Sequence, residues 1–311
     1  MLVSAVVCTH NPDNYPNLRE TMDSLLAQTH REIEIIVVVD GNEKLYEKLS
    51  ADYGSKAAVK TILLEKNVGV SGARNAGIKV AKGDVIAFID DDAVAAKEWV
   101  ENLLTTYRDL DAAAAGGKIL PVWLAGAPDY LPEELYWLVG ITHKGFAGEK
   151  VAEVRNTFGP NMSFKREVFD KIGFFNENLG FAQKRAPSIQ AEEPEFALRM
   201  RQKLGKGVIY NPKAIVYHKI PPAKVKVRAL LKRAFYQGYS KALMRRLNIA
   251  ADSIATERSY LRALLLHYVP SRMKRIYLLS ELKKLSLLIA CIISVGLGFT
   301  YAYVKSCIKR R

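Results

Sequence analysis

Cysteine is scarce in this chain. Only three occur in 311 residues, at Cys8, Cys291 and Cys307, and no two have the close spacing of a zinc ribbon or a redox pair. Neither a disulfide framework nor a cysteine-based metal site is therefore expected to organise the fold. The remaining composition, with 49% hydrophobic and 25% charged residues, is that of a globular protein and excludes a disordered chain.

Acidic residues are nearly missing from the last part of the chain. Residues 219–311 contain 20 Lys and Arg but only 3 Asp and Glu, a net charge of +17. Residues 1–218 hold the other 26 basic and 29 acidic residues and are close to neutral. The total charge of +14 thus belongs to one region. Because it does not cover a folded face, we expect no nucleic-acid partner.

The basic region also contains the most apolar run in the chain. Residues 285–304 form 20 positions without a charge, enough for a helix to cross a hydrocarbon core of about 30 Å. A core helix seldom lacks polar residues over such a length, so we expect a membrane helix, either transmembrane or in-plane and re-entrant. The basic helical region 221–284 before it and the basic tail 305–311 after it are expected to contact anionic lipid.

The start of the chain does not resemble a secretory leader. Residues 2–9 are apolar but short, lack a basic stretch before them and run directly into a polar turn. We therefore expect the folded body to lie on the cytoplasmic face of the cell membrane.

Short β-branched runs alternate with helical patterns over the first 120 residues. This alternation predicts an α/β fold built from βαβ units around a mainly parallel sheet. Strands are expected at residues 3–8, 34–39, 61–64, 85–89, 208–210 and 214–217. Helices are expected at 18–26, 43–53, 71–81, 97–107, 166–172, 193–204, 223–247 and 257–282, the last with an interruption at Pro270. Residues 121–160, rich in Pro, Gly and aromatics, predict a long loop layer with short helices.

Polar clusters follow three of the expected strands, at Thr9-His10-Asn11, at Asp40 and at Asp90-Asp91-Asp92. Ligands of parallel sheets bind beyond the carboxyl ends of the strands. Three adjacent carboxylates repel one another, and such an oxygen-rich set suits Mg²⁺ or Mn²⁺ together with substrate phosphates. The alternative is a helix start with acidic residues near the positive end of its dipole.

A glycine-containing loop at residues 66–77 opens one of the expected helices. Gly69 and Gly72 allow close backbone approach, and the free N–H groups at a helix start favour an anion. Arg74 can clamp a phosphate or stack on a base. The spacing matches neither the dinucleotide fingerprint nor the P-loop, which disfavours an oxidoreductase and a P-loop ATPase.

These motifs, in this order, resemble family 2 glycosyltransferases of the GT-A fold over about residues 1–220. The later runs 159–166 and 191–199 fit the same family. The resemblance implies a nucleotide-sugar site formed by Thr9, His10, Asn11, Asp40, Arg74, Asp90 and Asp91. It also implies a metal held by Asp92, with the strand-end His218 as a candidate further ligand, and an acceptor side near Asn161 and Arg166.

The family's acceptor-side motif is usually Glu-Asp, in which the Asp is the general base. Here the motif reads Glu192-Glu193, so the resemblance assigns the base to Glu193, one methylene longer, with Glu192 as the next candidate. Without the resemblance, Glu192 and Glu193 would be interpreted as two exposed acidic residues in the first turn of a helix.

The middle and C-terminal segments resemble membrane-attached archaeal and bacterial enzymes of lipid-linked glycan assembly. The resemblance implies inverting, metal-dependent transfer from a nucleotide-sugar, a UDP-sugar such as UDP-glucuronate, to a lipid-linked saccharide. Two alternatives stay open. One is a polyprenyl-phosphate glycosyltransferase, in which an already anionic phosphate attacks. The other is a catalytically silent membrane-binding protein of the same fold.

Overall fold

The computed structural model describes residues 1–179, 191–246 and 255–308, which fall into two compact units. The first unit comprises Met1–Pro121, 147–179 and Glu192–Lys219. The second comprises Val122–Phe146 and the described residues from Ile220 onward. Part of the loop layer expected at 121–160 thus groups with the C-terminal helices.

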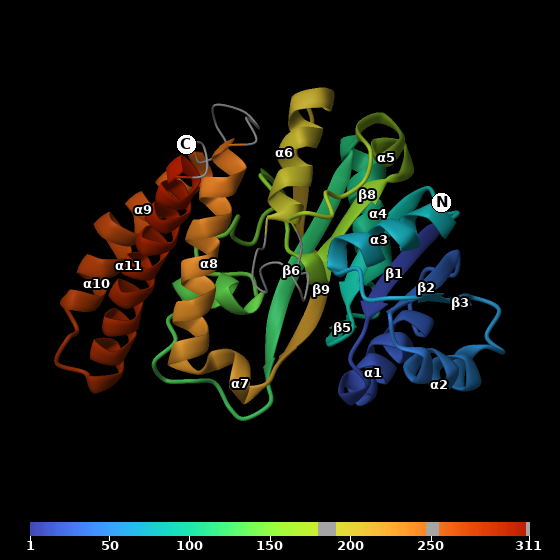
Figure 1. The fold of residues 1–311 in the computed structure, drawn as a ribbon, viewed down its shortest axis with the longest axis horizontal. Coiled ribbons are helices and arrows are strands. Elements are labelled where there is room, and N and C mark those ends of the chain that lie inside the picture. Colours follow the sequence, from blue (N-terminus) through green and yellow to red (C-terminus); the bar gives the residue numbers. More distant parts are fainter. Residues whose placement is uncertain (180–190, 247–254, 309–311) are drawn as a thin grey trace. The chain divides into compact units, whose positions relative to one another are not determined.

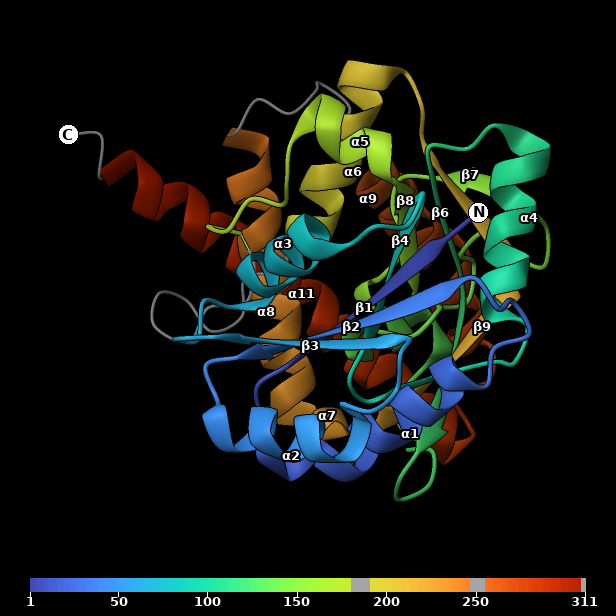
Figure 2. The ribbon, with the colours of Figure 1, turned by 90° about the vertical axis from the view of Figure 1, so that its right-hand side faces the viewer.

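Parallel strands form the N-terminal half of the sheet in the first unit (Figures 1 and 2). β1 (Val3–Thr9) lies between β2 (Ile33–Asp40) and β4 (Val85–Asp90), and β3 (Val59–Leu64) pairs with β2. Each of these runs is rich in β-branched residues, which favour a buried parallel strand. Because the strands are parallel and in register, the carboxyl ends of β1, β2 and β4 meet at one edge.

The strands contributed by the later chain run antiparallel to their neighbours. β8 (Met162–Lys165) pairs with β4 and with β6 (Ala114–Trp123). β9 (Val208–Ile220) pairs with β5 (Ala93–Ala95) and with β7 (Ala152–Val154). The order β3-β2-β1-β4-β8-β6-β9-β5 is therefore mixed, whereas the sequence predicts a mainly parallel sheet. Of these added strands, β5, β7 and β8 are short and β6 begins with Ala and Gly, so their sequences carry a weak strand signal, whereas β9 falls where strands are expected.

Helices cover both faces of this sheet. Three pack on one face: α1 (Tyr15–Leu26), α2 (Glu43–Tyr53) and α4 (Trp99–Leu110). Three pack on the other: α3 (Val70–Val80), α5 (Arg166–Ile172) and α6 (Glu192–Leu204). The alternation along β1 divides the two cores, since Val7 belongs to the first and Val6 to the second. Figure 2 shows α1 and α2 on one side of β1–β3 and α3 on the other.

The second unit is helical. It contains the 3-10 helix Glu133–Val139 and five α-helices: α7 (Pro222–Val225), α8 (Val227–Arg246), α9 (Ala255–Ala263), α10 (Val269–Met273) and α11 (Leu279–Ile308). A π-helical turn, Leu264–Tyr268, joins α9 to α10 immediately before Pro270, where the sequence predicts an interruption. Within the described residues, one segment, Leu279–Lys305 of α11, is long and apolar enough to cross a membrane.

Candidate functional site

Thr9 and Asp91 tie the ends of β1 and β4 together. The Thr9 hydroxyl donates to Oδ2 of Asp91 at 2.6 Å, and the Asn14 side-chain amide donates to the Asp91 carbonyl at 3.2 Å. Burial raises the pKa of Asp91 to about 6; the Thr9 hydrogen bond opposes this shift, and the charge of Asp92 reinforces it. The middle carboxylate of the triplet therefore anchors the turn on which its two neighbours stand.

Asp90, Asp92 and His218 form a group that could hold a metal ion. One ligand atom from each lies within 4.8 Å of the others, and Nε2 of His218 is 3.1 Å from Oδ1 of Asp92. The pairing of β5 with β9 places Ala93 opposite His218 and so brings the end of β9 to this turn. Two carboxylates and one imidazole fit the ligand preferences of Mn²⁺ and, with added water, of Mg²⁺. The sequence resemblance implies Asp92 and His218 as metal ligands; the structure adds Asp90, which the resemblance places in the nucleotide-sugar site.

A buried arginine links this group to the expected general base. The guanidinium of Arg74, on α3, lies 3.7 Å from Oδ1 of Asp90, 3.6 Å from Oε1 of Glu192 and 3.5 Å from Oε1 of Glu193. Burial lowers the pKa of Arg74, but the charges of the three carboxylates outweigh burial and raise it. Arg74 therefore stays cationic in the interior and holds three carboxylates, one from the end of β4 and two from α6, in one cluster.

Glu192 and Glu193 begin α6 and face Arg74. The side chain of Glu192 is 3% exposed and that of Glu193 is 19% exposed, so the pair is not a set of solvated acids at a helix start. Burial raises the pKa of Glu193, and the charge of Arg74 opposes that shift. Of the two, Glu193 is the more accessible carboxylate, and a raised pKa makes it the stronger base.

Gly159 borders the same cluster. A Cβ atom at this position would lie 2.5 Å from Nη2 of Arg74 and 2.7 Å from Oε1 of Glu193, so any larger residue would displace one of them. The resemblance directed attention to Asn161 and Arg166 in this run and missed Gly159. Because Gly159 and Glu193 are far apart in the chain, the sequence carries no signal of their contact.

Asp40 fixes the loop that opens α3. Its Oδ1 accepts from the backbone N–H of Val68 at 2.8 Å and its Oδ2 from that of Gly69 at 3.0 Å. Burial raises the pKa of Asp40, and the two amides oppose the shift. The carboxylate of Asp40 therefore sets the start of the helix that carries Arg74; its place in the nucleotide-sugar site stays a prediction.

Asn75, next to Arg74 on α3, holds a distant segment against that helix. Its side chain accepts from the Phe175 N–H at 3.0 Å and donates to the Phe175 carbonyl at 3.0 Å. It also donates to Oε1 of Glu177 at 3.0 Å. Consecutive residues of the glycine-containing motif thus have separate tasks: Arg74 pairs with the acids, and Asn75 orders the chain that leads toward α6.

His10 and Asn11 are exposed beside the strand edge. The Asn11 side chain accepts from the N–H of Asp13 at 3.1 Å and caps a 3-10 turn, while the His10 carbonyl accepts from Asn42 at 3.4 Å. They flank the carboxyl end of β1 together with Thr9, and their contacts with a nucleotide stay predictions.

The two residues expected on the acceptor side have other partners. Asn161 is fully buried; its Oδ1 accepts from Nε1 of Trp99 at 2.9 Å, and its amide donates to the Ala214 carbonyl at 2.8 Å. Nε of Arg166 donates to the Gly83 carbonyl at 2.9 Å, before the amino end of β4 and thus at the sheet edge opposite Asp90. Arg166 therefore lies away from the cluster around Arg74. The side-chain amide of Asn161 forms its hydrogen bonds within the core.

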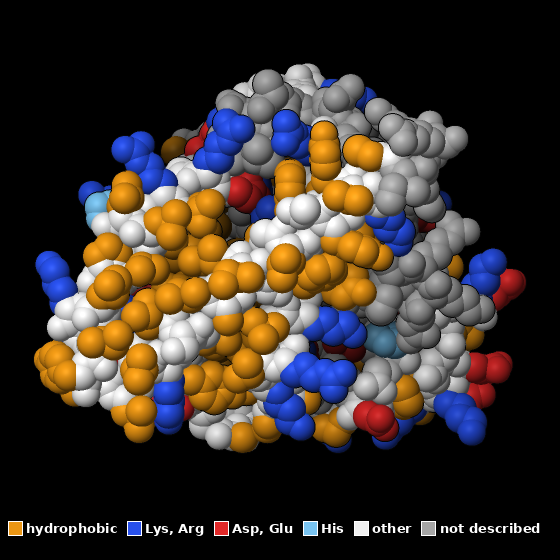
Figure 3. Space-filling view, turned by 60° about the vertical axis from the view of Figure 1, so that its left-hand side comes forward, with side chains coloured by type: hydrophobic (Ala, Val, Ile, Leu, Met, Phe, Trp, Pro, Cys, Tyr) orange, Lys and Arg blue, Asp and Glu red, His pale blue; other side chains and the backbone are white. Residues whose placement is uncertain are grey.

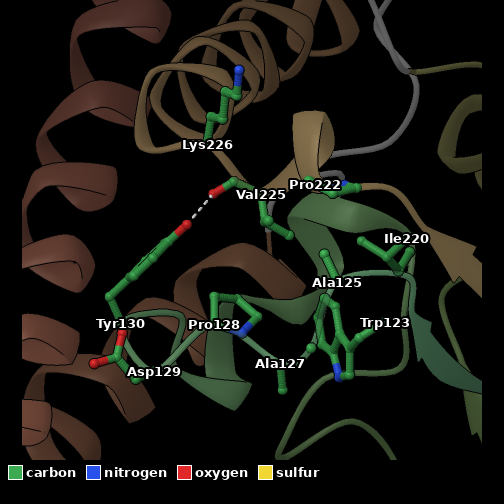
Figure 4. Close-up of a pocket in the computed structure, with 11 residues that line it drawn as sticks. Trp123, Ala125, Ala127, Pro128, Asp129, Tyr130, Ile220, Pro222, Val225 and Lys226 are labelled. Carbon is green, nitrogen blue, oxygen red and sulfur yellow. Dashed lines mark hydrogen bonds between the residues drawn. The ribbon is translucent and has the colours of Figure 1, made fainter.

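The second unit contains an apolar pocket of about 490 Å³ (Figure 4). Its walls include Trp123, Pro128, Ile220 and Val225, and the Tyr130 hydroxyl donates to the Val225 carbonyl at 3.0 Å. Asp129 and Lys226 also line the pocket.

The sheet order, the helices on both faces and the acidic turn at the strand edge are those of a glycosyltransferase of the GT-A fold. Residues 4–173 match the model of glycosyl transferase family 2. The chain is also 40% identical over 305 residues to the glucosyl-dolichyl phosphate glucuronosyltransferase of Haloferax volcanii, covering 97% of this chain and 96% of that protein. The chain belongs to glycosyl transferase family 2 and is a glycosyltransferase.

Solved structures share the fold at low sequence identity. A mannosyltransferase from Pyrobaculum calidifontis, in complex with GDP-Man and Mn²⁺, has a TM-score of 0.62 and 16% identity, covering 96% of this chain and 87% of that one. TarS residues 1–349 from S. aureus, in complex with UDP-GlcNAc, has a TM-score of 0.55 and 17% identity, covering 95% and 82%. Both likenesses show the GT-A fold.

Proposed function

We propose that this protein is an inverting, divalent-metal-dependent glycosyltransferase. It moves a sugar from a nucleotide-sugar to a lipid-linked saccharide at the cytoplasmic face of the cell membrane. The observation that carries the proposal is the cluster in which Arg74 joins Asp90, of the candidate metal group, to Glu193. A leaving diphosphate needs positive counter-charge, and an attacking hydroxyl needs a base. The cluster offers ligands for a metal ion that would supply the counter-charge, and it offers a carboxylate that can act as the base.

Asp90, Asp92 and His218 would hold Mg²⁺ or Mn²⁺ beneath the diphosphate. When bound, the ion supplies Lewis-acid neutralisation of the departing phosphate charge. The presence of Mn²⁺ beside GDP-Man in the Pyrobaculum structure supports this assignment. The three residues come from the turn after β4 and from the end of β9, so donor binding would depend on the pairing of β5 with β9.

Glu193 accepts the proton from the acceptor hydroxyl as that oxygen bonds to the anomeric carbon. The bond from that carbon to the diphosphate breaks on the opposite face, so the configuration inverts. Partial exposure and a raised pKa support Glu193 as this base. Arg74 orients the carboxylate, and its charge limits how far burial can raise the pKa of Glu193.

The relative from Haloferax volcanii supports the choice of substrates. Its name specifies a glucuronosyl group and glucosyl-dolichyl phosphate. That name supports a glucuronosyl donor and, as acceptor, a glycosylated polyprenyl or dolichyl phosphate. The family resemblance of the sequence implies that the donor is a UDP-sugar, with UDP-glucuronate the first to test. The basic region 221–284 and the apolar run 285–304 would hold the catalytic region 1–220 at an anionic membrane.

A donor screen tests the proposal. The detergent-solubilised protein is incubated with UDP- and GDP-sugars, with Mn²⁺, with Mg²⁺ or with EDTA, and both nucleotide release and thermal protection are measured. We expect protection by one nucleotide-sugar that requires the metal, and transfer of that sugar to a lipid-linked glucoside. Equal turnover in EDTA, or protection by none of the donors, would contradict the proposal.

A further inference from the structure

The outer sides of α9, α10 and α11 expose an apolar surface in the second unit. Of the 24 large hydrophobic side chains exposed within the described residues, 15 lie between Leu261 and Val304. They define the apolar face: Leu261, Leu265, Leu266, Met273, Ile276, Tyr277, Leu278, Leu279, Leu282, Ile289, Ile293, Leu297, Tyr301, Tyr303 and Val304. Figure 3 shows hydrophobic side chains gathered over this part of the molecule with Lys and Arg beside them. A contiguous apolar surface of this kind indicates a binding surface.

Only one side of α11 belongs to the apolar face. Ile289, Ile293 and Leu297 recur at helical spacing and are 44%, 56% and 60% exposed. The opposite side is buried, with Leu288 at 0% and Cys291 at 1% exposure, and packs on α8 and on the 3-10 helix Glu133–Val139. A helix that crosses a bilayer alone would present apolar residues to lipid all round; α11 does so along one stripe.

Helix α8 runs alongside α11 in close contact. Oγ of Ser294 donates to the Leu231 carbonyl at 2.8 Å. A Cβ atom on Gly298 would lie 1.8 Å from the Phe235 carbonyl oxygen, so glycine is what allows the two backbones to approach. Leu231 thus lies beside Ser294, and Phe235 lies beside Gly298. Because the residue number rises in the same direction on both helices, the two helices run parallel, with each of these pairs at the same level along their axes.

This side-by-side alignment of α8 with α11 argues against an α11 that spans the membrane. Leu231 contacts Ser294, which is at the centre of the run 285–304, so the exposed Lys232 lies level with that centre. In a spanning arrangement this ammonium would enter the middle of the bilayer. The 3-10 segment packed on Leu288 would also place irregular backbone at membrane depth. Both are costly in hydrocarbon.

We infer that the second unit binds one leaflet of an anionic bilayer through the apolar face, with α11 in the plane of the membrane and not across it. Exposed basic side chains occur in the same segments of the chain as the apolar face and match anionic headgroups: Arg258, Arg262, Lys274, Arg275 and Lys305. The inference rests on the proposed function, since a lipid-linked acceptor requires the protein at a membrane surface.

Vesicle flotation of the full chain tests whether lipid covers the apolar face. We expect binding to vesicles of equal parts phosphatidylglycerol and phosphatidylcholine, weaker binding to phosphatidylcholine alone, and partial release at high salt. Replacing Ile293 and Leu297 together by Asp should weaken binding at least about tenfold. Leu110→Asp, on α4 and 52% exposed, is the matched control and should bind as the wild type does. Absence of flotation, or equal flotation of the double variant, would overturn the inference, because the apolar face would then not be the surface that binds lipid.

Thiol labelling distinguishes an in-plane helix from a spanning one. Cys307 is exposed beyond the apolar run, while Cys291 is buried. The partly exposed Cys8 is replaced by Ser in every variant. In sealed membrane vesicles, a membrane-impermeant maleimide should then reach Cys307 from the same side as a cysteine introduced by Leu110→Cys in a Cys307→Ser background. Labelling of Cys307 only from the opposite side would overturn the inference. Neither experiment requires donor or acceptor, so their failure would leave the proposed chemistry standing, and a failed donor screen would leave lipid binding standing.

Discussion

Nη1 of Arg74 lies 3.5 Å from Oε1 of Glu193. The two residues stand on different helices, α3 and α6, and are far apart in the chain, yet the buried guanidinium also reaches Asp90 at the end of β4. One cation therefore sets the position of the proposed base relative to the proposed metal site. That relationship makes the cluster sensitive to changes that leave the fold intact.

The pH dependence of turnover should respond to Arg74. Glu193 acts only when ionised, so turnover falls as pH drops through its pKa, which burial has raised. The charge of Arg74 holds that pKa down, so Arg74→Gln should raise it further. The acidic limb of the normalised kcat profile should then move to higher pH.

Arg108→Gln removes a surface cation paired with Glu101 and serves as the control for net charge. Its kcat profile should match that of the wild type. An Arg74→Gln profile with an unshifted acidic limb would show that another group titrates.

The space at Gly159 should be essential to the cluster. Gly159→Ala places a methyl group within 2.7 Å of both Arg74 and Glu193, so one side chain must move. We expect loss of kcat on the order of 100-fold, because small misplacements of reacting groups have effects of this size. Gly296→Ala, where an added Cβ meets nothing within 4 Å, is the control and should retain activity. Thermal melts should separate a local displacement from unfolding.

The candidate metal group can be tested by binding as well as by activity. Mn²⁺ should raise the melting temperature of the wild type, since a ligand that binds the native state stabilises it. Asp92→Ala should abolish this shift and reduce Mn²⁺-stimulated turnover at least about 100-fold. His218→Gln should weaken both. If Mn²⁺ raised the melting temperature of Asp92→Ala as much as that of the wild type, the metal would bind at another site.

A buried ion cluster should stabilise the second unit. Arg272 pairs with Glu134 at 2.6 Å and with Glu281 at 2.7 Å, and the Glu134 side chain is only 2% exposed. Arg272→Ala leaves that carboxylate uncompensated and should cost about 3–5 kcal/mol of unfolding free energy. The exposed pair of Arg108 with Glu101, also at 2.6 Å, provides the comparison, and Arg108→Ala should cost less than about 1 kcal/mol. Equal losses in denaturant titrations would contradict this account.

The parallel half of the sheet could be predicted because its strands are uniform β-branched runs that end in polar residues. The antiparallel half could not, because β5 is the tripeptide Ala-Val-Ala and β6 begins Ala-Ala-Gly-Gly. The two strands expected at 208–210 and 214–217 are one strand, β9. Asn211 and Pro212 interrupt the pattern, but the Asn211 amide is satisfied by Thr106 Oγ1 at 3.0 Å and by the Asn102 carbonyl at 2.9 Å.

The resemblance of the motifs implies Asp92, His218 and Glu193 one by one. It does not show which of these side chains lie close together in the fold. The pairing of Arg74 with Glu192 and Glu193 depends on how α3 and α6 pack over the sheet, and no spacing in the sequence encodes it. The packing of the C-terminal apolar run could not be predicted either. The run 285–304 is apolar throughout, and only its packing beside α8 shows that half of it is already covered.

The base assignment is tested most directly by Glu193→Gln, assayed with a lipid-linked sugar acceptor while donor affinity is measured separately. Gln keeps the shape of the side chain but cannot accept a proton. We expect kcat to fall by about 10²–10⁴-fold, a loss of about 3–5 kcal/mol of transition-state stabilisation, with donor affinity unchanged. Glu193→Asp, shorter by about 1.5 Å, should keep partial activity, and the surface variant Glu167→Gln should keep all of it. Wild-type turnover of Glu193→Gln would contradict the account and would indicate either Glu192 as the base or an anionic phosphate as the nucleophile.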